Sequence, residues 1–176
     1  MRPSLFALAV AFFLATAALT IGCGSGTEAL TLEEYFARFE AIDTEIDAQI
    51  DELYADFPED ASALTDDANL LYFKELGAAF TPIMADNIDR LAHLDPPFEV
   101  GDQHDELVAA GAELLAAYEE AAAVIAEAEN MAEFETFNSE VTASLIEPIS
   151  QFNAACVAVV DIATANDIAV TITCDG

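Results

Sequence analysis

Apolar residues recur at intervals of three and four along four long stretches of this chain. The first stretch carries Leu32, Phe36, Phe39, Ile42, Ile46, Ile50, Leu53 and Phe57, and three similar stretches follow it. This spacing places the apolar side chains on one face of an α-helix. Alternation of apolar and polar residues, which is typical of a strand, occurs only at the C-terminus, from Ile168 to Thr173. The pattern therefore predicts an all-α protein.

Capping residues and prolines give the bounds of the first two helices. Thr31 and Glu34 have the spacing of a capping box, which predicts a helix start at Thr31. Pro58 is expected to end this helix, and Thr65 or Asp66 to begin the next one, which runs to Pro96–Pro97. Pro82 lies inside the second stretch and predicts a kink, with two shorter helices as the alternative.

The third and fourth stretches are separated by a weaker signal. The third helix is expected from about Val100 or Gly101 to Glu129, and it contains an alanine-rich run of high helix propensity. Asn130 with Glu133 predicts a new helix cap, and Asn138–Ser139 is the rival break. The fourth helix contains Pro148, which predicts a second kink, and Asn166–Asp167 is the expected stop.

The four helices have similar expected lengths of about 27, 29, 30 and 35 residues, or roughly 40 to 52 Å. Long helices joined by short connections favour an up-down-up-down four-helix bundle. The expected bundle domain covers residues 31–176, and its short extended tail follows the fourth helix.

The composition supports a folded chain with an acidic surface. Of 176 residues, 55% are hydrophobic, and 34 acidic residues face only four lysines and arginines, for a formal charge of -30. A disordered acidic tail would be poor in apolar residues. Binding to nucleic acid is excluded, because the dominant interaction with phosphates would be repulsive.

The first 22 residues have the pattern of an export signal. Met1-Arg2 is followed by an uncharged apolar run from Leu5 to Ile21, which is short for a bilayer span, and small residues come directly after it. An ordinary secretory peptide cut nearby and a retained single-span anchor are the alternatives. Removal of Arg2 with the signal leaves three basic residues against 34 acidic ones, a formal charge of -31.

The segment Leu19-Thr20-Ile21-Gly22-Cys23 resembles the lipobox of bacterial lipoprotein signal peptides. The resemblance implies cleavage after Gly22 and acylation of Cys23, with palmitate among the acyl groups. Residues 23–30 are then a lipidated cysteine and a flexible tether, and the protein is expected to face the extracytoplasmic side of a cell membrane. Thr20 departs from the family, which usually has Leu there.

The two remaining cysteines, Cys156 and Cys174, predict a disulfide in an exported chain. Cys156 precedes the expected helix stop by roughly 15 Å, and an extended tail can reach back over that distance. Two free thiols are the alternative. The ending, with Ala154-Ala155-Cys156 before an apolar tail and a last cysteine, is similar to that of uncharacterised exported bacterial lipoproteins, which implies no activity.

The residues that could carry chemistry are few. His93 and His104 flank Pro96–Pro97, so a helical hairpin would bring them to one end of the bundle with Asp95. Imidazole and carboxylate groups can bind divalent metals, although this spacing matches no metal motif. The alternative is a core role for His104 and a helix-end role for His93.

No catalytic motif and no cofactor fingerprint is present in the sequence, and no cofactor is expected. The prolines and Gly77 could leave a pocket between helices, although the phenylalanine-rich stripes indicate a core. The sequence therefore favours a membrane-anchored binding or interaction module, with a protein or small-molecule partner that it does not identify. A metal-binding bundle is the first alternative, and an enzyme of unrecognised type is the second.

Overall fold

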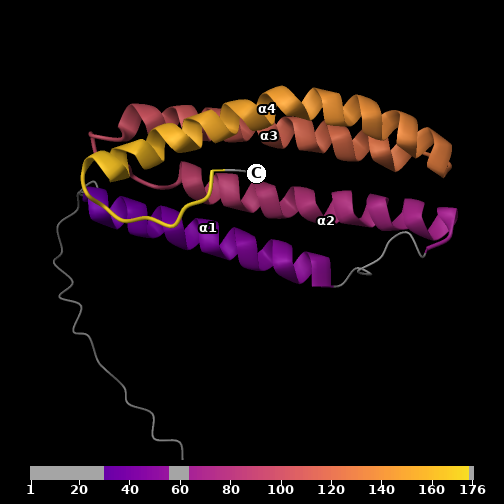
Figure 1. Cartoon of the computed structure of the whole chain (residues 1–176), viewed down its shortest axis with the longest axis horizontal. Coiled ribbons are helices and arrows are strands. Elements are labelled where there is room, and N and C mark those ends of the chain that lie inside the picture. The colour runs from indigo at the N-terminus through magenta and orange to yellow at the C-terminus, as the bar shows by residue number, and fades with distance from the viewer. Residues whose placement is uncertain (1–29, 56–63, 175–176) are drawn as a thin grey trace, which may run out of the picture.

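The computed structural model describes residues 30–55 and 64–174, which form four antiparallel helices and a C-terminal tail (Figure 1). Each helix packs on the next one in the chain, and the described residues contain no strand. This arrangement confirms the predicted four-helix bundle. The helices are α1 (Leu32–Ala55), α2 (Asp66–Ala92), α3 (Gly101–Glu127) and α4 (Met131–Ala165).

Three of the helices begin at the side-chain caps that the sequence predicts. Thr31 and Glu34 form a reciprocal capping box, in which the Glu34 amide donates to the Thr31 hydroxyl at 3.2 Å and the Thr31 amide donates to the Glu34 carboxylate at 3.0 Å. Thr65 caps α2, and Asn130 caps α4 by accepting from the Glu133 amide at 3.0 Å. The predicted boundary at Asn130 is therefore confirmed, because these contacts satisfy amides that a helix start leaves unpaired.

Both internal prolines lie inside continuous helices. Helix α2 runs through Pro82 and α4 through Pro148, so the alternative of two shorter helices in the second stretch is wrong. The rival break at Asn138–Ser139 is also wrong, since both residues lie within α4. Among the described helices, α4 is the one long and apolar enough to span a bilayer by length and composition, and its packing on α3 and α2 places it in the bundle.

The main hydrophobic core lies at the end of the bundle where α1 begins. It is formed by side chains of all four helices, with the α2–α3 loop contributing Val100; its largest buried members are Tyr35, Phe36, Leu107, Val100 and Val159. A smaller cluster around Leu70, Ala128 and Phe134 lies at the opposite end. Helix α1 ends at Ala55, short of that end in Figure 1. Helix α1 therefore does not extend to the smaller cluster.

The tail folds back along α1 and is held by the predicted disulfide. Cys156 and Cys174 are bonded, with their Cα atoms 5.6 Å apart. The alternation from Ile168 to Thr173 appears as alternating burial: Ile168, Val170 and Ile172 pack on the main core, while the residues between them are exposed. No neighbouring strand pairs with the tail in the described structure, and the Thr171 amide donates instead to the Glu40 carboxylate at 2.8 Å.

Candidate functional site

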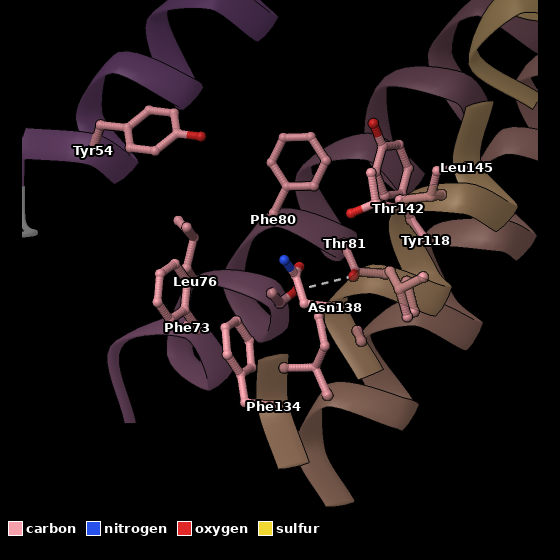
Figure 2. Close-up of a pocket in the computed structure, with 15 residues that line it drawn as sticks. Tyr54, Phe73, Leu76, Phe80, Thr81, Tyr118, Phe134, Asn138, Thr142 and Leu145 are labelled. Atoms are coloured by element: carbon pink, nitrogen blue, oxygen red, sulfur yellow. Dashed lines mark hydrogen bonds between the residues drawn. The ribbon is translucent and has the colours of Figure 1, made fainter. Parts of the chain in front are cut away.

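A cavity of about 320 Å³ lies in the half of the bundle that holds the smaller cluster. Helices α2, α3 and α4 form its walls, and Tyr54, near the end of α1, faces it from the fourth side (Figure 2). Apart from Tyr54, the lining residues come from α2 as far as Thr81, the second half of α3 and the first half of α4, so the cavity is remote from the start of α1. Its volume is at the lower end of the range for small-molecule sites.

None of the lining residues carries a charge. Most are aliphatic or aromatic, and five bear a neutral polar group. The apolar lining residues are Phe73, Leu76, Gly77, Phe80, Ala121, Ala122, Ile125, Phe134, Val141 and Leu145, and the polar ones are Tyr54, Thr81, Tyr118, Asn138 and Thr142. In a chain this acidic, a wall without carboxylates indicates a site for an uncharged, mainly apolar group.

Small residues on facing helices leave this space unfilled. Gly77 on α2 lies opposite Ala122 on α3, and a Cβ placed at Gly77 would be 3.9 Å from the Ala122 Cβ, an ordinary van der Waals distance. Neither side chain is large enough to fill the gap between the aromatic rings around it. Gly111 differs, because a Cβ there would lie 3.3 Å from Ile88, so α2 and α3 approach closely at that level. Along α2 and α3, the cavity therefore follows the level at which Gly111 and Ile88 pack closely.

Pairs of aromatic rings stiffen the walls. Phe80 on α2 meets Tyr118 on α3 edge to face, with ring centroids 5.2 Å apart, and Phe73 stacks on Phe134 at 4.6 Å. Both pairs join different helices across the cavity, as Figure 2 shows. Such contacts add to the energy of burial and restrict the rings to few orientations. The cavity consequently has aromatic faces on which a flat or chain-like apolar ligand can pack.

The polar groups differ in what they can offer a ligand. The Thr81 hydroxyl donates to the Gly77 carbonyl at 3.0 Å, which leaves its oxygen to accept. Burial, with a smaller contribution from Tyr54, raises the pKa of Tyr118, so this phenol stays protonated and can donate. Asn138 and Thr142 are exposed at the rim. These groups can orient one or two neutral polar atoms of a ligand.

The structure does not assemble the metal site that the sequence suggested on His93, His104 and Asp95. His104 is 3% exposed, and its Nδ1 is hydrogen-bonded to the Tyr35 hydroxyl at 3.0 Å. His93 is exposed on the outside of the α2 end, where it contacts Asp89. Within residues 30–55 and 64–174, no three His, Cys, Asp or Glu side chains form a group that could hold a metal ion. His104 is buried against Tyr35 whereas His93 is exposed, so the described structure does not bring the two imidazoles into one group with Asp95.

The cavity lining contains no histidine and no carboxylate. Gly22 and Cys23, on which the lipidation hypothesis depends, lie outside the described residues.

No protein-family model matches the chain, and neither a curated protein nor a solved structure is similar to it at a significant level.

Proposed function

We propose that this protein is an exported, membrane-anchored module that binds a small, uncharged, mainly apolar ligand in the cavity between α2, α3 and α4. The cavity of about 320 Å³ with no charged lining residue is the observation that carries this proposal. A bound ligand would bury its surface against aromatic rings and be oriented by a few neutral polar groups.

The charge of the chain favours a ligand without negative charge. The formal charge is -30, and no lining residue is basic. The one lysine of the chain, Lys74, follows the lining residue Phe73 and donates to the Ala126 carbonyl at 2.8 Å. An anionic ligand would therefore lose its hydration without gaining a charged partner, at a cost of several kcal/mol.

The lipid anchor in this proposal is inferred from the sequence alone. Gly22-Cys23 follows an apolar export signal and resembles a lipobox, which supports cleavage after Gly22 and acylation of Cys23. The lipid would hold the acidic bundle on the extracytoplasmic side of a membrane. Mass spectrometry of the native N-terminus tests this, and a mature chain that lacks Cys23 would refute it.

The binding site is tested with the neutral dye N-phenylnaphthylamine, whose fluorescence rises in apolar surroundings. The chain from Gly24 to Gly176, purified with its disulfide and without detergent, is expected to enhance the dye's emission saturably. Ala122→Leu should fill the cavity and weaken binding at least tenfold. Ala123→Leu is the matched control, because Ala123 is the exposed neighbour on the same helix and lies outside the cavity lining.

Two results would contradict the site. One is an absence of saturable binding by the wild-type chain, which would favour an interaction module that uses its outer surface. The other is equal weakening by Ala122→Leu and Ala123→Leu, which would place the dye elsewhere. Far-UV circular dichroism of both variants checks that they keep the helical fold.

A further inference from the structure

Phe98, in the loop between α2 and α3, is 98% exposed. The next most exposed large apolar side chain among the described residues is Ile146, at 65%, and it lies on a helix surface. Burial of a phenylalanine is strongly favourable, so complete exposure of one at the tip of a loop indicates a surface that another apolar medium covers.

A hydrogen-bonded turn holds Phe98 in this position. The Val100 amide donates to the Pro97 carbonyl at 3.1 Å, which closes a turn with Phe98 and Glu99 at its centre. Both ends of the turn are fixed, because Pro97 and Val100 are buried and Val100 belongs to the main core. The ring of Phe98 is thus presented by a braced turn.

The turn lies where the chain enters the bundle. The Leu30 amide donates to the Asp95 carbonyl at 3.4 Å, and Leu30 packs on the main core. Figure 1 shows the start of α1, the α2–α3 loop and the end of α4 together at this end. Cys23 is seven residues before Leu30, so it lies within roughly 25 Å of that contact even with a fully extended connection.

We infer that Phe98 inserts into the interfacial layer of the membrane that holds the lipid anchor, so that the bundle meets this membrane with its α2–α3 end. This inference rests on the proposed anchor. Aromatic side chains favour the boundary between headgroups and acyl chains. A short tether keeps the loop at a high local concentration near the surface, so a single ring is sufficient for contact.

The charges around Phe98 favour contact with a membrane over contact with a second copy of the chain. Asp95, Glu99 and Asp102 are all exposed beside it. Pairing two such loops would bring like charges together, whereas zwitterionic headgroups present no net charge. The same carboxylates should weaken contact with anionic lipid at low salt.

This orientation has a consequence for the cavity. The cavity lies away from Phe98 along the bundle, since most of its lining residues come from the halves of α2, α3 and α4 that are distant from the α2–α3 loop. With the loop at the membrane, the cavity is held at a distance from the membrane surface. Its ligand would then enter from the aqueous side.

The chain has no tryptophan, so one introduced tryptophan reports its own surroundings. The native lipoprotein carrying Phe98→Trp is reconstituted into phosphatidylcholine vesicles with and without brominated acyl chains. We expect a blue-shifted emission that brominated lipid quenches at least threefold more than in the control, Leu71→Trp. Leu71 is 56% exposed and lies at the opposite end of α2.

Flotation of the vesicles separates the possible failures. Protein that floats with the vesicles but shows no quenching at Phe98→Trp would overturn the inference and leave the anchor intact. Equal quenching of both variants would show that the bundle does not meet the membrane with its α2–α3 end. A blue shift without vesicles would show that another copy covers the loop. Protein that does not float would refute the anchor itself, and the inference with it.

Discussion

The buried pair of Tyr35 and His104 links the packing of α1 on α3 to pH. Tyr35 is fully buried, His104 is 3% exposed, and their rings meet edge to face. Burial lowers the pKa of His104, although the charge of Asp105 partly opposes this effect. The folded state therefore holds a neutral imidazole at a pH where the unfolded chain, with a histidine pKa of about 6.5, begins to bind a proton.

The sign of the resulting pH dependence follows from this difference. His104 contributes stability that is present above about pH 6.5 and is lost as the pH falls toward its lower folded pKa. We expect the free energy of unfolding, measured in urea from about pH 7 to about pH 5, to decrease less in His104→Gln than in the wild type. His93→Gln is the control, since His93 has a 75% exposed side chain. If all three proteins show the same slope, this assignment is wrong.

Asp167 stores backbone strain at the end of α4. Its φ is 56°, in the left-handed region, and the Ile168 amide donates to the Ala163 carbonyl at 2.9 Å in a glycine-type helix stop. Asp167→Gly should raise the free energy of unfolding by about 0.5–1 kcal/mol, because glycine adopts this conformation without a Cβ clash. Asn166→Gly is the control, since Asn166 has φ -107°. Equal effects of the two changes on the urea midpoint would contradict the strain argument.

The C-terminal tail is the element whose stability depends most on one covalent bond. The Cys156–Cys174 disulfide closes a loop with a sequence separation of 18. Cys174→Ser should lower the free energy of unfolding by about 3 kcal/mol, the chain-entropy value for a loop of this length. Urea unfolding measures it, and the wild type in reducing agent should shift by a similar amount. A wild type that is insensitive to the reductant would show that tail packing alone holds the element.

The helix starts were predictable because their caps act within one turn of the chain. Contacts between residues that are distant in sequence have no such local signal and were not predicted. Thr31 and Asn130 act on amides three residues away, so their roles follow from spacing alone. The bond from the Thr171 amide to Glu40 joins residues 131 positions apart, and no local pattern encodes it. For the cavity, the sequence pointed to Gly77, which does line it, but the facing of Gly77 and Ala122 depends on the register between two helices.

The positions of the two histidines in the fold could not be predicted from the sequence for a related reason. The sequence places His93 and His104 on either side of one loop, but the direction of each side chain depends on the rotation of its helix about its axis. Helix α3 turns His104 inward to Tyr35, whereas His93 at the end of α2 stays in solvent. His104 lies among the apolar residues on one face of its helix, and this position indicated that its side chain is directed into the core.

At the scale of the whole molecule, charge opposes the compact state. The part of the chain after the signal carries 34 acidic residues and only Arg38, Lys74 and Arg90 as bases. Arg90 pairs with Glu45 at 2.7 Å, but Lys74 donates to a backbone carbonyl instead of a carboxylate. Exposed pairs of this kind are worth about 1 kcal/mol or less, so the repulsion is little offset.

The fold should therefore gain stability as salt is added. Raising ionic strength from about 10 to 150 mM shortens the screening length from roughly 30 to 8 Å, which removes most repulsion between distant exposed carboxylates. We expect Tm in calorimetry to rise by roughly 3 °C for each kcal/mol recovered. Sodium chloride and choline chloride should act alike if screening is the cause, because a cation bound at a specific carboxylate cluster would distinguish them. A Tm unchanged over this range would contradict the prediction, because it would mean that screening lowers the free energies of the folded and unfolded chains equally.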